Sequence, residues 1–208
     1  MTGAGTEAER GERTNENARP PRLFVGLKLS PEITGELAEL ARSLEACGVR
    51  LVPSADMHLT LVPPWNEPNV GDALETLRAS VKGFAAFPLS FARLAYGPTL
   101  RHPRLLWAEC VASDVLVELR MALLTSFGQL DPRPFRPHVT LARIPPREQG
   151  IARKAPIERR LSLAQYVTSV ELFQSPVKPQ SGYQVVASLG LGREPRLALP
   201  RLALPRLA

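Results

Sequence analysis

The chain carries the same four-residue pattern twice, and the order of predicted elements around each copy is also repeated. His58-Leu59-Thr60-Leu61 and His138-Val139-Thr140-Leu141 contain two of only three histidines in 208 residues. Each copy follows a predicted strand and a predicted helix. A tandem duplication explains this order, and two similar lobes commonly meet about a pseudo-twofold axis. We therefore expect the two motifs to face one shared central cleft.

The first half has clear boundary signals. Residues 23–29 are rich in β-branched and aromatic residues and predict a strand. Ser30 can cap a following helix that has Pro31 in its first turn and apolar residues at helical spacing, and Gly48 ends that pattern. The motif strand is expected over residues 57–62, ending at Pro63-Pro64.

The second half repeats this order with different residues. We expect a strand over residues 105–111, a helix capped by Ser113 or Asp114 and closed by Gly128, and a motif strand over residues 138–144. The remaining apolar segments predict further elements. These are a helix over 70–84 and strands over 88–94, 167–173 and 183–189.

The motifs suit acid–base chemistry at phosphorus. Alternate side chains of a strand share a face, so each histidine stands beside its threonine while the intervening residues point into the core. An imidazole has an ordinary pKa of about 6.5, so a facing pair can supply one proton acceptor and one proton donor. The Thr60 and Thr140 hydroxyls can donate to phosphate oxygens as charge accumulates. His58, His138, Thr60 and Thr140 are therefore the candidate catalytic residues.

Two other interpretations of these histidines exist. A single histidine on a strand is usually a core or surface residue, but two copies at matching places favour function. A metal site would need a third ligand, and neither motif offers a carboxylate or thiolate beside its imidazole. We expect no metal and no cofactor. His102, in a basic loop with no partner motif, is expected on the surface.

The chain ends differ in composition from the body. Residues 1–21 have few large apolar side chains and predict a disordered arm, whereas residues 22–192 predict the folded domain. Residues 193–208 repeat Pro-Arg-Leu-Ala-Leu and predict a low-complexity tail, which holds much of the net charge of +6. The alternative for the tail is a basic docking segment. No signal peptide or membrane-spanning run is apparent, so we expect a cytoplasmic monomer without a membrane partner.

The residues around the motifs resemble the 2H phosphoesterases, and within them the RNA 2′,3′-cyclic phosphodiesterases historically called 2′-5′ RNA ligases. The resemblance covers nearly all of residues 22–192 and is most specific over the second motif and its flanks. It implies a bilobal α+β fold with antiparallel sheets and outer helices. It also implies hydrolysis of a 2′,3′-cyclic phosphate, on RNA ends or nucleotides, to a 2′-phosphomonoester. By analogy, His58 would donate a proton and His138 would accept one.

Four further residues are candidates for substrate binding. Trp65 follows the first motif, where family members often have Lys-Phe-Leu-Gly, and could stack on a base or pack the lobe edge. Arg136 and Arg143 flank the second motif and could pair with phosphate or remain solvated. Tyr183 falls in the last predicted strand and could approach the cleft or pack in the core.

The sequence alone leaves other functional classes open. The same acid and base could serve a 2′,5′-linked oligonucleotide or a small cyclic nucleotide, and reversal toward RNA ligation would use the same chemistry. A non-catalytic RNA- or nucleotide-binding module of the same fold is a further alternative. No Lys motif for nucleotidyl transfer, Gly-rich phosphate loop or GxSxG elbow supports ATP-driven ligation or serine hydrolysis.

Overall fold

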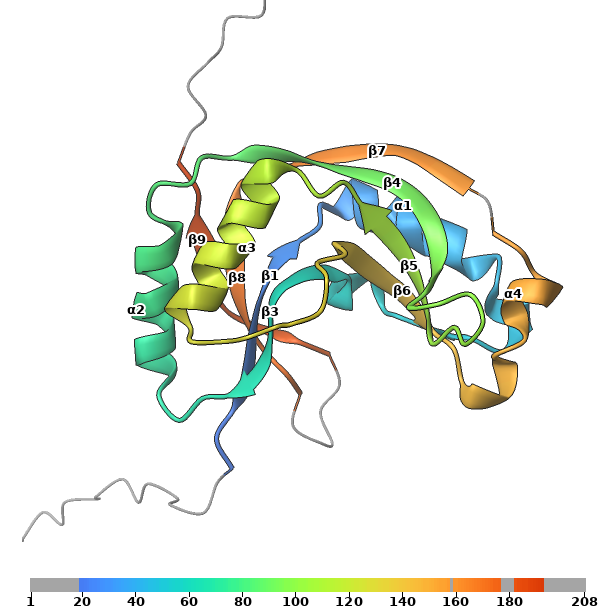
Figure 1. Cartoon of the computed structure of the whole chain (residues 1–208), viewed down its shortest axis with the longest axis horizontal. Helices are drawn as coiled ribbons and strands as arrows, with labels where there is room; N and C mark the ends of the chain where they lie inside the picture. The colour runs from blue at the N-terminus through green and yellow to red at the C-terminus, as the bar shows by residue number, and fades with distance from the viewer. Residues whose placement is uncertain (1–18, 158, 177–181, 193–208) are drawn as a thin grey trace, which may run out of the picture.

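The computed structural model describes residues 19–157, 159–176 and 182–192. The described residues form one α+β unit in which a curved antiparallel sheet is flanked by helices (Figure 1). The predicted tail and nearly all of the predicted arm lie outside the described residues. The elements in chain order are β1 (Arg22–Lys28), α1 (Pro31–Arg42), β2 (Arg50–Leu51), β3 (His58–Asn66), α2 (Val70–Val81), β4 (Phe87–Gly97), β5 (Leu105–Cys110), α3 (Asp114–Ser126), β6 (His138–Arg143), α4 (Ile151–Lys154), β7 (Arg159–Val167), β8 (Ser169–Gln174) and β9 (Gln184–Gly190).

The strand order is symmetric about the two motif strands. It runs β7-β4-β5-β6-β3-β1-β8-β9, with the short β2 also paired to β6. In the first half β1 leads through α1 to β3, its direct antiparallel neighbour, and in the second half β5 leads through α3 to β6 in the same way. The predicted duplication is therefore present in the topology, and β3 and β6 meet at the centre of the sheet.

The helices α1 and α3, which occupy equivalent places in the two halves, begin where the sequence predicts. The Ser30 side chain accepts a hydrogen bond from the Ile33 amide at 3.3 Å, and Ser113 occupies the equivalent capping position before α3. No described helix is long and apolar enough to pass through a membrane.

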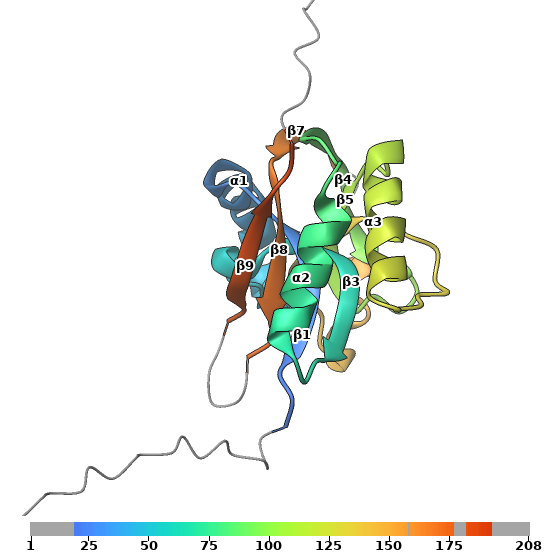
Figure 2. The same cartoon turned by 90° about the vertical axis from the view of Figure 1, so that its left-hand side faces the viewer.

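Each repeated helix packs onto strands of the other half. α1 packs against β6 and β7, whereas α3 packs against β3 and α2. Figure 2 shows α1 and α3 on opposite sides of the strands. Because the helices are exchanged in this way, buried side chains of both halves merge into one hydrophobic core.

The motif strands have the predicted alternation. Leu59, Leu61, Val139 and Leu141 are at most 1% exposed, while the histidines and threonines between them are half-buried. The predicted end of the first motif strand at Pro63-Pro64 is wrong, because β3 continues to Asn66. Val62 pairs with Val25 and Trp65 with Leu23, so the two prolines occupy a bulge where the ladder does not need their missing N–H groups.

The sequence interpretation also missed β7, which pairs with β4 at the edge of the sheet. Residues 159–166 are exposed or half-buried, and only Val167 is buried. A strand with so little buried surface gives a weak apolar pattern, because one edge and much of one face meet water. This polar edge strand carries Arg159 and Arg160, which belong to the basic surface near the second motif.

Gly26 is a specific packing constraint next to the first motif. Gly26 pairs with Thr60, and a methyl group on it would lie 2.7 Å from the carbonyl oxygen of Leu59. We expect Gly26→Ala to lower the free energy of unfolding by about 1–3 kcal/mol, because rigid backbone cannot move aside cheaply. Gly35→Ala is the matched control. Gly35 lies within α1, and a methyl group on it would meet no other atom within 4 Å outside the helix backbone. Alanine at this position should therefore raise the free energy of unfolding by about 0.5–1 kcal/mol. Equilibrium urea unfolding measures both, and equal stabilities of the two variants would contradict this account.

Candidate active site at the centre of the sheet

The pairing of β3 with β6 brings the two motifs together. Leu59 lies opposite Val139 in this antiparallel pair. Counting outward from that pair places His58 beside Thr140 and Thr60 beside His138. Directly opposed residues of a sheet share a face, so all four candidate catalytic side chains lie on one face of the sheet.

Both imidazoles are anchored in the same way. The Nδ1 atom of His58 lies 2.7 Å from the carbonyl oxygen of Asp56, and that of His138 lies 2.7 Å from the carbonyl oxygen of Arg136. A carbonyl oxygen can only accept, so Nδ1–H donates in each case. In the neutral imidazole Nε2 then holds the lone pair, and in the imidazolium it carries the second proton. Each ring thus has one nitrogen fixed by the backbone and one available for chemistry.

Aromatic side chains surround each imidazole. The Trp107 ring centroid lies 4.3 Å from that of His138. The His58 ring lies 4.8 Å from Phe24 and 4.9 Å from Tyr183, the latter edge-on. These contacts restrict ring rotation and remove water from one side of each imidazole.

The two halves pack their histidines with different residues. Gly26 pairs with Thr60 of the first motif, and Trp107 pairs with Thr140 of the second, so these residues occupy equivalent places. Trp107 covers its histidine directly. At the glycine, the missing side chain leaves room for the Phe173 ring, which approaches to 3.4 Å from the position of a Cβ and lies 5.5 Å from His58.

Burial lowers the pKa of both histidines. For His58 burial is the largest cause, opposed by the hydrogen bond to the Asp56 carbonyl and by the Asp56 charge. For His138 burial is again the largest cause, opposed by the hydrogen bond to the Arg136 carbonyl and by the Glu109 charge. The positive charge of His138 also lowers the pKa of His58, as expected for two imidazoles facing one site.

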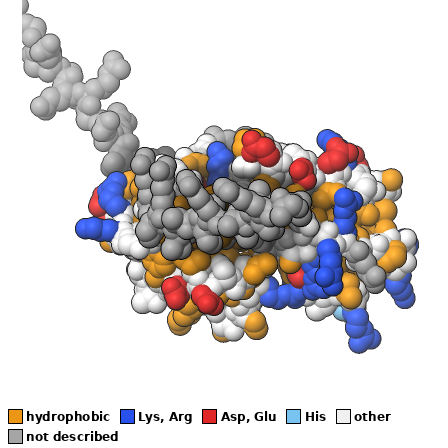
Figure 3. Space-filling view, turned by 90° about the horizontal axis from the view of Figure 1, so that it is seen from above, with side chains coloured by type: hydrophobic (Ala, Val, Ile, Leu, Met, Phe, Trp, Pro, Cys, Tyr) orange, Lys and Arg blue, Asp and Glu red, His pale blue; other side chains and the backbone are white. Residues whose placement is uncertain are grey.

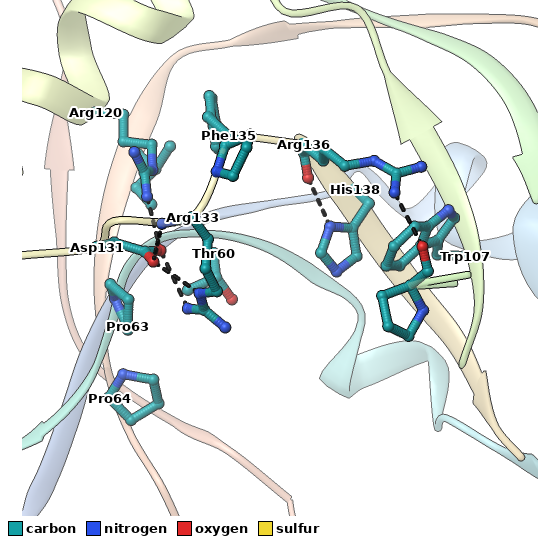
Figure 4. A pocket seen from close by; sticks show the side chains of 13 residues that line it. Thr60, Pro63, Pro64, Trp107, Arg120, Asp131, Arg133, Phe135, Arg136 and His138 are labelled. Atoms are coloured by element: carbon teal, nitrogen blue, oxygen red, sulfur yellow. Dashed lines mark hydrogen bonds and ion pairs between the residues drawn. The ribbon is translucent and has the colours of Figure 1, made fainter. Parts of the chain in front are cut away.

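A cavity of about 530 Å³ opens beside His138 and Thr60, a volume in the range of small-molecule sites. Its far wall is the segment between α3 and β6. Asp131 receives hydrogen bonds from Arg120 at 2.8 Å and from Arg133 at 2.7 Å, and the Arg120 guanidinium lies over the Phe135 ring at 4.5 Å. Figure 4 shows this cluster across the cavity from His138 and Trp107.

Arg136 joins this cavity to the adjoining strands. Its guanidinium donates to Glu109 at 2.7 Å and to the Pro98 carbonyl at 3.1 Å, and it lies 5.0 Å from the Trp107 ring. Burial favours the neutral form of Glu109, but the hydrogen bonds from Arg93 and Arg136 outweigh it and keep the pKa of that carboxyl below its usual value. The Arg136 charge is therefore partly neutralised and its position is fixed.

The other predicted binding residues lie in two different places. Arg143 and Tyr183 line a second cavity of about 250 Å³ on the His58 side, together with Asp56, whose carboxylate accepts a hydrogen bond from the Tyr183 amide at 2.9 Å. Trp65 is not brought into either cavity, as far as the described residues define them. Its indole packs on Phe127 and donates to Glu67 at 2.9 Å, because β3 continues beyond the prolines and carries Trp65 to the lobe edge.

Several residues of the site were not predicted from the sequence. Asp56 was missed, and so was the carbonyl contact of Arg136, a residue predicted only to bind substrate; both stand two residues before a histidine, and this shared spacing was a usable signal. Phe135 and Asp131 had no comparable signal, because their roles depend on Arg120 from a different element. His102 is exposed, as predicted. Among the described residues, no three His, Cys, Asp or Glu side chains form a potential metal-binding group.

Comparisons with known proteins agree with this architecture. Residues 29–175 match the sequence model of the 2′-5′ RNA ligase superfamily. The chain is 28% identical over 177 residues to the RNA 2′,3′-cyclic phosphodiesterase of Bacillus subtilis, covering 75% of this chain and 91% of the relative. It is 26% identical over 130 residues to the protein of the same name from Thermotoga maritima, covering 59% of this chain and 70% of the relative.

Solved structures extend the likeness to the fold. The crystal structure of TT0787 from Thermus thermophilus superposes with a TM-score of 0.68 at 26% identity, covering 83% of this chain and 99% of that one. The structure of LigT from E. coli complexed with phosphate superposes with a TM-score of 0.65 at 20% identity, covering 85% and 100%.

The carbonyl contacts predict a specific tautomer. At a pH where both rings are neutral, we expect His58 and His138 to carry their proton on Nδ1, and ¹⁵N-resolved NMR of the imidazoles measures this directly. The same titration should give each ring a pKa below 6.5, because burial is the dominant cause. The exposed ring of His102, which belongs to neither motif, is the comparison for the tautomer assignment. Protonation of Nε2 in either neutral ring would contradict the hydrogen bonds described above.

Proposed function

The chain belongs to the 2′-5′ RNA ligase superfamily, and from this premise we propose that it hydrolyses terminal 2′,3′-cyclic phosphates of RNA to 2′-phosphomonoesters without a metal ion or cofactor. The names of the two bacterial relatives support this substrate class. Within the chain, one observation carries the proposal. Two imidazoles on adjoining strands share one face of the sheet, each has Nδ1 held by a backbone carbonyl, and a cavity of about 530 Å³ opens beside one of them, His138.

The reaction requires one proton to be taken and one to be given. Nε2 of neutral His138 accepts a proton from water as the water oxygen attacks phosphorus. The bond between phosphorus and the ribose 3′ oxygen breaks, and Nε2–H of protonated His58 donates to that leaving oxygen. The product keeps its phosphate on the 2′ oxygen, and exchange of one proton with solvent restores both histidines.

Nearby charges favour this division of roles. Asp56 stabilises the imidazolium form of His58 more than Arg143 destabilises it. Arg136 destabilises the imidazolium form of His138 more than Glu109 stabilises it. With burial acting on both rings, these charges favour the protonated form of His58, which the proton donor needs, and the neutral form of His138, which the proton acceptor needs.

The remaining residues position the phosphate and the nucleoside. Thr60 and Thr140 hydroxyls flank the histidines and can donate to the non-bridging oxygens, where negative charge grows during attack. The terminal nucleoside occupies the cavity beside Thr60, against the Phe135 ring, which Arg120 and Asp131 hold in place. Arg136 contributes positive charge at the entrance of this cavity.

Removal of either histidine should abolish most turnover. We expect His58→Ala and His138→Ala each to reduce kcat by about 100-fold or more, the usual worth of general acid–base catalysis. The assay uses a short RNA ending in a 2′,3′-cyclic phosphate, in excess EDTA, with the position of the product phosphate determined.

His102→Ala is the matched control, because His102 is exposed in the loop between β4 and β5 and lines neither of the two cavities beside the motifs, and it should keep wild-type kcat. Wild-type rates in either motif variant would overturn the assignment of that histidine. Complete loss of wild-type activity in EDTA would instead require a metal-dependent mechanism.

The pH dependence follows from the same two rings. Activity needs neutral His138 and protonated His58. With rising pH, kcat/KM should therefore rise as His138 loses its proton and fall as His58 loses its proton. Since burial places both pKa values of the free enzyme below 6.5, we expect a bell-shaped profile with its maximum on the acid side of pH 6.5. A plateau that extends to pH 8 would contradict the role of His58 as the acid.

A further inference from the structure

A line of charged residues crosses the sheet from the second motif to the outer edge. In the strand register, His138 of β6 lies opposite Glu109 of β5, Glu109 opposite Arg93 of β4, and Arg93 opposite Arg160 of β7. Directly opposed residues lie on the same face, so this row begins at a catalytic candidate and ends at an exposed strand. The next pair is Leu94 with Arg159, which alternation places outside this row, but at the start of β7 Arg159 lines the same groove as Arg160.

The charges in this row are unbalanced. Glu109 is bonded to both Arg93, at 2.6 Å, and Arg136, at 2.7 Å, so one carboxylate serves two guanidinium groups. Arg159 and Arg160 are exposed and form no ion pair with another described residue; their chain neighbour Glu158 lies outside the described residues. Figure 3 shows Lys and Arg side chains gathered toward the right-hand end of the molecule, where Figure 1 places α4 and the start of β7.

The opposition of Arg93 and Arg160 has an energetic cost. Like charges directly opposite each other destabilise an antiparallel pair. An anionic ligand placed between two such groups would remove that repulsion. Because Arg93 and Arg136 share the single carboxylate of Glu109, the row keeps a net positive charge that a phosphate would balance.

These residues line a groove that continues the candidate active site. The groove has a volume of about 610 Å³, and Arg93, Arg159 and Arg160 are among its lining residues. Pro98 and Arg136 line both this groove and the cavity beside His138. The groove thus opens into the position assigned to the terminal nucleotide.

We propose that this groove binds the phosphodiester backbone of the RNA strand that leads away from the cyclic end. The inference rests on the proposed function, because it extends that substrate beyond its terminal nucleotide. Three strand spacings separate His138 from Arg160, a distance of about 14 Å. A single phosphate cannot contact both, so the groove makes an oligonucleotide a better substrate than a cyclic mononucleotide. Exposed Leu100 and half-buried Ile157 give the groove apolar surface for the ribose or base.

The test compares a groove variant with a charge-matched control. Arg159→Gln/Arg160→Gln removes two positive charges from the groove without breaking an ion pair to any other described residue. Arg78→Gln/Lys82→Gln removes the same charge from the end of α2, which packs on α3, β8 and β9. Both are compared with wild type in binding a labelled octaribonucleotide that ends in a 2′-phosphate, over a range of salt concentrations.

The expected result has two parts. The groove variant binds the octamer at least 10-fold more weakly than wild type at low salt. Its slope of log affinity against log salt falls by about 0.7 for each lost phosphate contact. The α2 variant keeps the wild-type affinity and slope.

Turnover provides the second measurement. The ratio of kcat/KM for an octamer with a 2′,3′-cyclic end to that for adenosine 2′,3′-cyclic phosphate should exceed 10 in wild type and fall toward 1 in the groove variant. Equal losses of octamer affinity in the two double variants, or wild-type behaviour of the groove variant, would overturn the proposal that the groove binds RNA. Either result would leave the proposed function intact. If RNA binding depends on the groove but wild type hydrolyses neither substrate, the groove remains an RNA-binding site and the proposed reaction is overturned.

Discussion

The pairing of β3 with β6 is the constraint on which the candidate site depends. Leu59 and Val139 form the registered contact where the two halves of the sheet meet, and both side chains are fully buried. A shift of one residue in that register would turn the histidines and threonines into the core and expose the leucines and valine to water. The hydrophobic effect that fixes the register therefore also fixes the position of the polar site. The exchanged packing of α1 and α3 reinforces this, since each helix holds the opposite half in place.

The histidine anchors show how the backbone can prepare a side chain for chemistry. A hydrogen bond to a main-chain carbonyl leaves ring orientation and tautomer independent of any second ionisable group. Asp56 and Arg136 therefore serve their histidines through the same backbone atom, even though their side chains carry opposite charges. This separation lets the two anchors be geometrically equal while the two electrostatic environments differ. A pair of equal anchors with unequal charges is what an acid and a base acting on one phosphorus atom require.

Much of the fold could be predicted from short-range signals in the sequence. The Ser30 cap, the start of α3 after Ser113, the alternation in the motif strands and the repeated order of elements all depend on neighbouring residues, and the structure confirms them. The prediction failed where tertiary context decides. β3 passes through Pro63-Pro64 because a bulge opposite β1 accommodates them, and β7 forms because β4 offers a free edge. The motif residues could be found from their duplication, whereas the wall made by Arg120, Asp131 and Phe135 combines residues that share no sequence pattern.

The differences between the halves are as informative as the duplication. Lys28 lies opposite His58 where Glu109 lies opposite His138, and Gly26 stands where Trp107 stands in the second half. On the first side, space left by glycine is filled by aromatic rings. On the second side, tryptophan and Glu109 hold Arg136 at the junction of a cavity and a basic groove. A symmetric cleft would bind a cyclic phosphate in two opposite orientations, only one of which places the leaving oxygen near the proton donor. Because the larger cavity and the basic groove both lie on the His138 side, the proposed RNA substrate would enter in one direction, and the proposed reaction would then give each histidine one role.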